Sequence, residues 1–288
     1  MRVISMDLQA AFAAAILAAS AGAARADVTA TRTLEESVAV ERGSAPLVIV
    51  KNVFGSVRVT THNRDTVDMT ATETITGDLQ SDIDRARAEV ELATDSEPGR
   101  VAFRVRRSGA DGECDCGRNW WDGFKVQYDI EVRVPQDAAL DLATVNDGDI
   151  VVEGVRGEIE ASNVNGAVRL TGLRGAGQVS TVNGKIDARF ERAPEETVSF
   201  KTVNGKIDVT FPESLAADLK FQTMNGEIYT DFDTAPVAAE PARQGSRDGR
   251  GFVLRMERSP VLRVGSGGPT HSFQTLNGDI YVRKGARQ

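Results

Sequence analysis

Carboxylates and tyrosines recur at matched positions in the second half of the chain, and they are the first candidates for chemistry. Asp187 and Asp208 follow the isoleucine of one short motif, Tyr229 and Tyr281 occupy the equivalent position in two other copies, and Glu227 lies nearby. Carboxylates paired in one groove can cleave a glycosidic bond. Carboxylates that alternate with lysines can instead balance charge on an exposed sheet. We expect the second role, and we expect Tyr229 and Tyr281 to belong to a binding surface.

The segment 108–123 holds both cysteines and both tryptophans of the chain. Cys114 and Cys116 are close in sequence, so we expect a local disulfide if the chain is exported, with free thiols as the alternative. Trp120 and Trp121 are adjacent, and neighbours on an extended strand point to opposite faces. Either one indole contacts a sugar or a protein partner, or one caps the end of the core.

Catalytic and cofactor motifs are absent from the sequence. Ser266 lacks the G-x-S-x-G context of an activated serine, and the Gly-Lys pairs lack the rest of a phosphate-binding loop. His62 and His271 have no ligand spacing toward the cysteines, which disfavours zinc. Asp147 and Asp149 match a calcium repeat at one corner only. We therefore expect no enzyme activity, no metal and no cofactor.

Six copies of a T-x-N-G-x-[IV]-like motif supply the elements that position these residues. Thr-Val-Asn-Gly-Lys-Ile occurs at 181–186 and again at 202–207. The expected structural corner residues are Asn146, Asn165, Asn183, Asn204, Asn225 and Asn277, with Gly148, Gly166, Gly184, Gly205, Gly226 and Gly278. A period of about 20 residues around a turn dipeptide indicates stacked structural units. Glycines at half that spacing divide the first units into two short strands each.

Apolar residues recur in three columns around this corner. The first column is Leu142, Ala161, Val179, Phe200, Phe221 and Phe273; the second is Ile150, Val168, Ile186, Ile207, Ile228 and Ile280; the third is Val152, Leu170, Ala188, Val209, Thr230 and Val282. Alternation along each strand directs these columns inward and the charged residues between them outward.

Two all-β architectures fit the pattern. In a parallel β-solenoid, equivalent positions stack about 4.8 Å apart, and the corner asparagines can form a hydrogen-bonded ladder. In an antiparallel meander or sandwich, each Asn-Gly pair is a two-residue hairpin turn, which pairs Thr202 with Ile207. The motif is identical across units rather than complementary within a unit, so we favour the β-solenoid, also described as a β-helix.

The chain divides into three parts. Residues 1–26 contain an apolar run and an A-x-A site, which predicts a cleaved signal peptide, with a retained anchor as the alternative. No later run is long enough to span a membrane. Residues 27–136 are predicted to form strands, with one helix at 79–90. Residues 137–288 hold the repeats, interrupted by a polar insertion at 233–262 that we expect to be mobile.

A family resemblance accompanies these features. The repeated motif, NVFGSVRV at 52–59 and TLNGDIYVR at 275–283 resemble the bacterial putative-adhesin domains of unknown function, which are related to head-GIN domains. The resemblance implies an exported β-solenoid-like domain without established catalytic residues.

The functional expectation follows from the resemblance and the charge. A net charge of −8 disfavours nucleic acid as a partner. We expect a non-enzymatic, envelope-associated binding or scaffold module that is periplasmic, on the cell surface or secreted, and that contacts an envelope protein or a glycan. The alternatives are a carbohydrate-active β-helix enzyme and a regulator that senses cell-envelope stress.

Overall fold

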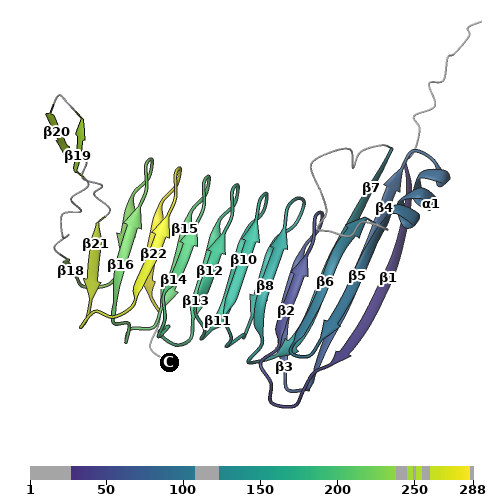
Figure 1. Cartoon of the computed structure of the whole chain (residues 1–288), viewed down its shortest axis with the longest axis horizontal. Helices are drawn as coiled ribbons and strands as arrows, with labels where there is room; N and C mark the ends of the chain where they lie inside the picture. The colour runs from purple at the N-terminus through teal and green to yellow at the C-terminus, as the bar shows by residue number, and fades with distance from the viewer. Residues whose placement is uncertain (1–26, 108–122, 238–244, 249–250, 255–259, 286–288) are drawn as a thin grey trace, which may run out of the picture.

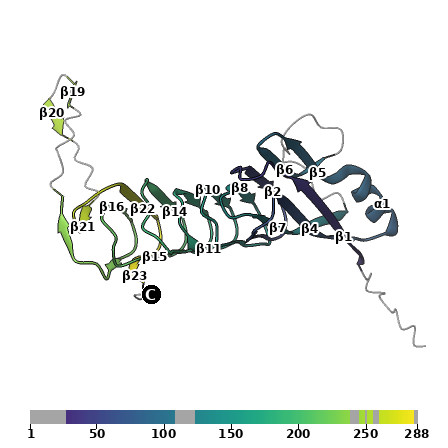
Figure 2. The same cartoon turned by 90° about the horizontal axis from the view of Figure 1, so that it is seen from below.

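The fold is all-β, with two long, mostly parallel sheets that face each other (Figures 1 and 2). The computed structural model describes residues 27–107, 123–237, 245–248, 251–254 and 260–285. The predicted signal peptide, Cys114, Cys116, Trp120 and Trp121 lie outside these residues, as do residues 238–244, 249–250 and 255–259 of the predicted insertion. No helix in the described ranges is long and apolar enough to cross a membrane.

The spatial order of the strands differs from their order in the chain. Sheet A runs β1 (Val28–Ala39), β4 (Thr66–Gly77), β7 (Phe124–Pro135), β3 (Val57–His62), β9 (Ile150–Glu153), β11 (Val168–Leu173), β13 (Ile186–Phe190), β15 (Ile207–Phe211), β23 (Ile280–Lys284) and β17 (Ile228–Thr230). Sheet B runs β5 (Val90–Glu97), β6 (Arg100–Arg107), β2 (Leu47–Lys51), β8 (Ala139–Thr144), β10 (Ile159–Asn163), β12 (Gly177–Ser180), β14 (Val198–Lys201), β22 (Thr270–Gln274), β16 (Ala217–Gln222), β21 (Val261–Val264) and β18 (Thr234–Pro236). β19 (Gly245–Asp248) and β20 (Gly251–Leu254) pair with each other, and α1 spans Gln80–Glu89.

Each copy of the motif joins a strand of sheet B to a strand of sheet A. We call such a pair of strands and its corner a repeat unit; in unit β14–β15 the corner is residues 202–206. The strands pair in parallel with the equivalent strands of neighbouring units, so that Ile186, Ile207 and Ile280 are direct neighbours. The two strands that flank an Asn-Gly pair therefore lie in different sheets, and the hairpin interpretation of these corners is wrong.

The three apolar columns form the core between the sheets. All their members are buried except Ile228 and Thr230, which are half-buried in the last strand of sheet A. In the first column, the Phe273 ring stacks between Phe200 and Phe221, with centroid distances of 5.6 and 5.3 Å. Stacking of identical positions thus converts a sequence period into continuous apolar ladders.

The corner asparagines form a hydrogen-bonded ladder. Each Nδ2 donates to the Oδ1 of the preceding unit in space: Asn165 to Asn146 at 2.7 Å, Asn183 to Asn165 at 2.9 Å, Asn204 to Asn183 at 2.9 Å, Asn277 to Asn204 at 2.8 Å and Asn225 to Asn277 at 2.8 Å. The ladder pairs amide groups that would otherwise depend on water at an exposed corner.

The threonine and glycine of the motif also have structural roles. The buried hydroxyl of Thr202 donates to the carbonyl oxygen of Gly184 at 3.1 Å. A Cβ on Gly205 would lie 1.9 Å from that same oxygen. Only glycine allows the backbones of successive corners to approach this closely, which explains why this residue type recurs in the motif.

The C-terminal unit β22–β23 is inserted between two earlier units (Figure 1). β22 lies between β14 and β16, and β23 lies between β15 and β17. Although Tyr281 and Val282 belong to the last unit in the chain, they do not cap the stack, because unit β16–β17 lies beyond them. Units with the same motif stack equally well in either order, so the motif does not encode the order.

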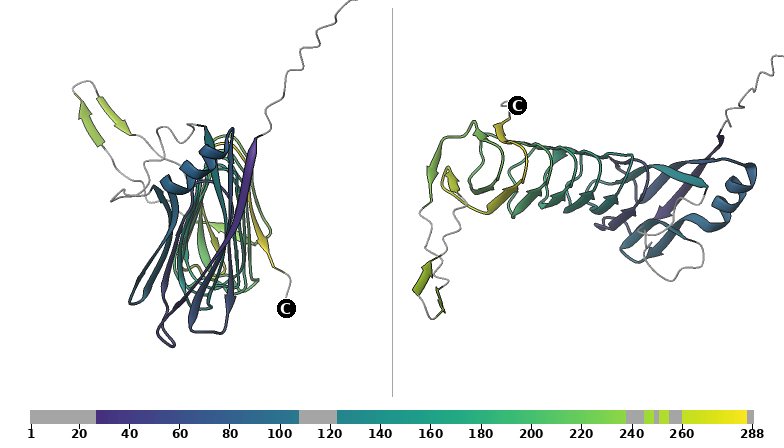
Figure 3. Two further views of the ribbon diagram at one scale, coloured as in Figure 1. Left: turned by 90° about the vertical axis from the view of Figure 1, so that its right-hand side faces the viewer. Right: turned by 90° about the horizontal axis from the view of Figure 1, so that it is seen from above.

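The N-terminal end has a different construction. The predicted helix at 79–90 is confirmed as α1, which lies beside β1 (Figures 1 and 3). The Asp82 carboxylate accepts a hydrogen bond from the Leu79 backbone N–H at 2.9 Å and caps the helix. β4 is antiparallel to both β1 and β7. Between this layer and the repeats, β2 and β3 pair in parallel with β8 and β9.

Candidate binding surface at the C-terminal end of sheet A

Nine outward side chains on three neighbouring strands form the best candidate site. They are Lys206, Asp208 and Thr210 of β15 and its corner, Asp279, Tyr281 and Arg283 of β23 and its corner, and Glu227, Tyr229 and Asp231 at β17. We call this set the tyrosine surface. Its residues alternate with the buried columns, so the core fixes the position of each side chain.

Two tyrosine rings form the centre of the tyrosine surface. Tyr229 and Tyr281 stack with centroids 4.7 Å apart and an interplanar angle of 9°. Lys206, on the opposite side of Tyr281 from β17, places its Nζ 5.1 Å from the Tyr281 ring centroid, and the Arg283 guanidinium lies 5.0 Å from it. Tyr281 is therefore enclosed by partners, whereas Tyr229 is 44% exposed at the end of the sheet.

Three charged groups of the tyrosine surface, Lys206, Asp208 and Arg283, form an ion-paired cluster. Asp208 accepts hydrogen bonds from Lys206 Nζ and Arg283 Nε, each at 2.8 Å. Partial burial of Asp208 acts to raise its pKa, but these hydrogen bonds outweigh it and hold the pKa below its ordinary value. The Tyr229 hydroxyl donates to the Glu227 carboxylate, which raises the pKa of Tyr229 to about 12. The surface is thus polar and ordered at neutral pH.

The three carboxylates considered for glycoside hydrolysis do not meet in one groove. Asp187 is the in-register neighbour of Asp208, but β23 separates both from Glu227. A general acid needs a carboxyl pKa raised toward neutrality, and the pKa of Asp208 is shifted the other way.

The two aspartates that gave the weak calcium match are bound to cations or backbone groups. Asp147 pairs with Lys125, and Asp149 pairs with Arg169 at 2.6 Å while accepting the Ala167 N–H at 2.7 Å. Within the described ranges, no three His, Cys, Asp or Glu side chains group in a way that could hold a metal.

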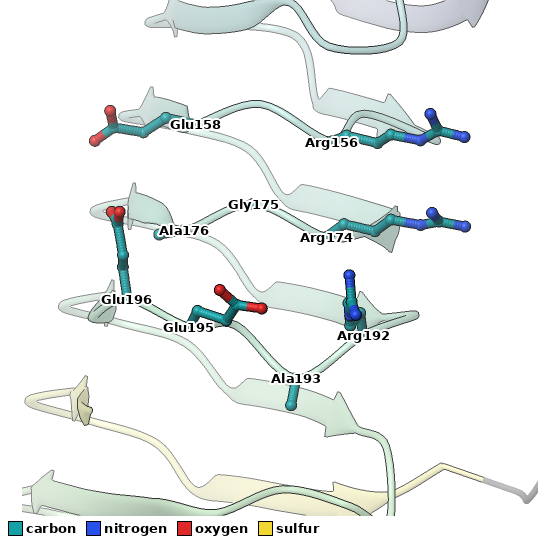
Figure 4. A pocket seen from close by; sticks show the side chains of 9 residues that line it. All are labelled: Arg156, Glu158, Arg174, Gly175, Ala176, Arg192, Ala193, Glu195 and Glu196. Carbon is teal, nitrogen blue, oxygen red and sulfur yellow. The ribbon is translucent and has the colours of Figure 1, made fainter. Parts of the chain in front are cut away.

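A second candidate is a groove of about 480 Å³ at the opposite corners of the units. Arg156, Arg174 and Arg192 lie along one side of it, Glu158 and Glu196 lie on the other side, and Glu195 lies between the two (Figure 4). Arg174 forms a bidentate pair with Glu191 at 3.0 and 3.1 Å, which lowers the pKa of that carboxyl. The groove offers side chains of both charges to a polar ligand.

The sequence pattern singles out some of these residues and misses others. It selects Tyr229 and Tyr281, which the structure brings into contact, but it does not select Arg283 or Asp231. Their alternation with the buried columns is the signal that could have found them. The arginine row is signalled by the G-[VL]-R-G corners at 154–157 and 172–175. The segment that contains Trp120 and Trp121 connects β6 to β7, where the repeat units have an Asn-Gly corner.

One protein-family model matches part of the chain. Residues 129–248 match the Toastrack DUF4097 domain. This Toastrack match begins in β7 and includes the units from β8 to β17, and it agrees with an all-β fold of two parallel-rich sheets. The resemblance to adhesin domains of unknown function is supported to this extent, and the relation to head-GIN domains stays a prediction.

Solved structures give weaker similarity. A putative cell adhesion protein from Clostridium sporogenes aligns at 10% identity and a TM-score of 0.42, over 88% of this chain and 100% of that chain. A putative lipid binding protein from Parabacteroides distasonis aligns at 11% identity and a TM-score of 0.27, over 88% and 96%. A putative adhesin from the same organism aligns at 10% identity and a TM-score of 0.22, over 88% of this chain and 97% of that chain. No curated protein matches significantly. These scores carry no functional argument.

Proposed function

We propose that this protein is a non-enzymatic, exported, envelope-associated module that binds or scaffolds an envelope protein or a glycan. In this proposal the stacked units act as a rigid β-solenoid-like, adhesin-like support, and the tyrosine surface is the contact region. The observation that carries the proposal is the exposed Tyr229 ring at the end of an ordered aromatic and ionic array. Export rests on the sequence of residues 1–26.

Binding is favoured over catalysis by the state of the polar groups. Asp208 is ion-paired with two cations, and its pKa is lowered. An exposed aromatic ring framed by charges is instead the composition of a recognition surface. The stress-sensing role remains a prediction from the resemblance, since no particular residue of the described structure favours it.

The proposal is tested by capture from envelope extracts. The full chain would be used as bait, in parallel with Tyr229→Ala and with Val182→Ala as a control. Val182 is 39% exposed on the corner before β13, which contributes no residue to the tyrosine surface. We expect the wild type and Val182→Ala to retain the same protein or glycan, and Tyr229→Ala to lose most of it. An unchanged set of captured molecules with Tyr229→Ala would contradict the proposal.

Two companion experiments separate the other parts of the proposal. Trp120→Ala combined with Trp121→Ala tests the segment 108–123 as a second contact. Protease accessibility in intact cells and in cells with a permeabilised outer layer tests export. A chain found only in the cytoplasm would contradict the envelope role, whatever the capture result.

A further inference from the structure

β17 is the free edge of sheet A. Its inner side pairs with β23: Gly278 N–H donates to Asn225 O at 2.9 Å, Ile280 N–H to Glu227 O at 2.9 Å, and Asp231 N–H donates to Val282 O at 3.1 Å. Successive residues of a strand direct their backbone groups to alternate sides. The N–H and C=O groups of Ile228 and Thr230 therefore point away from β23, and no other strand in the described parts of the chain pairs there.

The side-chain ladders of the repeat also end at this edge. Tyr229 presents the ring face that is turned away from Tyr281. At the adjoining corner, Asn225 donates to Asn277, and Met224 is 74% exposed. One more strand beside β17 would meet an aromatic face on the outer side of the sheet and free backbone groups along the edge.

We propose that β17 accepts an extended, basic peptide segment of a partner protein as an additional strand of sheet A. An aromatic side chain of that segment stacks on Tyr229, and basic side chains on either side of it pair with Glu227 and Asp231. Strand addition of this kind takes affinity from backbone hydrogen bonds and specificity from alternate side chains. This inference rests on the proposed binding role and names the chemistry of its partner.

Charge selects this occupant over a second copy of the chain. If two copies paired antiparallel about Tyr229, Glu227 of one copy would lie opposite Asp231 of the other. Like charges directly opposite each other in a sheet are destabilising. The same two carboxylates attract a basic strand. At the same end of sheet B, the edge strand β18 ends at Pro236, which has no N–H to donate, so of the two edges at this end the one suited to strand addition is that of sheet A.

The test uses a blocked synthetic peptide, Thr-Lys-Val-Tyr-Val-Lys-Thr, whose pattern reads the same in both directions. In either orientation its tyrosine can lie beside Tyr229 and its lysines beside Glu227 and Asp231. Fluorescence anisotropy of the labelled peptide with the full chain should give saturable binding. We expect Tyr229→Ala to weaken it at least tenfold, and Glu227→Lys with Asp231→Lys to abolish it. Asp187→Ala, two strands before β23 on the same face, should leave it unchanged.

Backbone pairing is tested with two analogues of the peptide that are N-methylated on alternate residues. One set of N–H groups must point toward β17, so we expect one analogue to lose binding and the other to keep it. Equal binding by both analogues, or no saturable binding by the parent peptide, would overturn the proposal.

A hexose oligosaccharide that binds in a Tyr229-dependent way while the peptide does not would also overturn it, and would leave the proposed binding role intact. Conversely, envelope capture that is indifferent to Tyr229→Ala would defeat the proposed function even if the synthetic peptide binds.

Discussion

The two ends of sheet A are built in different ways. At the N-terminal end, β1 is 12 residues long, α1 packs against β1, β4, β5 and β7, and Thr94 of β5 donates to the Glu36 carboxylate of β1 at 3.0 Å. At the C-terminal end, β17 has three residues and no strand is described beyond it. One end is built from elements that occur once, whereas the other is the last copy of a repeated unit.

The interiors of the two ends also differ, because one contains polar contacts that occur once and the other contains repeated apolar contacts. Near β1, the buried Glu73 carboxylate accepts hydrogen bonds from Arg32 at 2.8 Å and from the Tyr128 hydroxyl at 2.7 Å. The hydrogen bond from Arg32 to Glu73 raises the pKa of Arg32, and burial raises the pKa of Tyr128. Near β17, stacked phenylalanines fill the equivalent space. Unique polar contacts hold the first end, and repeated apolar contacts hold the second.

The largest predicted effect is in the inserted unit. Phe273→Ala removes a ring that stacks on two others, and we expect a loss of about 4 kcal/mol in the free energy of unfolding, the usual range for a buried phenylalanine. Denaturant unfolding followed by fluorescence or circular dichroism would measure it, with Phe273→Leu as the milder control. A loss below about 1 kcal/mol would show that the inserted unit does not hold the C-terminal end together.

At the N-terminal end, Glu73→Ala leaves Arg32 without its buried partner. We expect a loss of about 1–3 kcal/mol, because the buried Tyr128 hydroxyl loses its acceptor, whereas Arg32 is half-exposed and can be solvated by water. Glu73→Gln keeps an acceptor for the Tyr128 hydroxyl and should cost less. If both variants were as stable as the wild type, the contacts among Glu73, Arg32 and Tyr128 would not stabilise the N-terminal end.

The third prediction concerns pH and the buried His271. Its imidazole stacks on Phe211 with centroids 5.5 Å apart, and burial lowers the pKa of His271 to about 4. The unfolded chain takes up this proton near pH 6.5 and the folded chain only near pH 4. The contribution of neutral His271 to the free energy of unfolding is therefore fully present above pH 6.5. It is lost as the pH falls from 6.5 toward 4, by up to about 3 kcal/mol.

The comparison of wild type with His271→Phe isolates this contribution from that of the carboxylates. The variant should lose less stability between pH 6.5 and 4 than the wild type. Parallel pH profiles for the two proteins would contradict the assignment.

The smallest effects are expected in the asparagine ladder. Asn204→Ala breaks two side-chain hydrogen bonds, and Asn225→Ala breaks one. We expect losses of about 1–2 and about 0.5–1 kcal/mol, respectively. Thermal unfolding of the two variants and the wild type at constant pH would measure the difference between these losses. Equal losses would indicate that the ladder does not act through bonds between successive units.

The sequence predicts the repeated part of the fold well, because each motif residue has one dominant physical reason. Gly205 is required because the neighbouring backbone leaves no room for a Cβ, Asn204 because its side chain bonds in the asparagine ladder, and Ile207 because it is buried in the core. The sequence does not predict where the last unit inserts. Asn277 bonds to Asn204 on one side and to Asn225 on the other, and the same motif could form the same kind of bond at the end of the stack.

The candidate surface was only partly predictable for a related reason. Period-two alternation places Tyr229 and Tyr281 outward, but their contact depends on the insertion of β23 next to β17. The sequence pattern does not select the buried Glu73. An acidic residue at an inward position of β4 can be recognised as part of a polar cluster only when its partners Arg32 and Tyr128, which are distant in sequence, are known.

The most direct measurement is hydrogen exchange at the two edges of sheet A in the full chain, with and without the basic strand peptide. In the free protein, the amides of Ile228 and Thr230 should exchange quickly, because their N–H groups point away from β23. On addition of the peptide they should become protected, while the amides of β1 stay unchanged. Unchanged exchange at Ile228 and Thr230, or new protection confined to β1, would contradict the account of the C-terminal edge as the binding site.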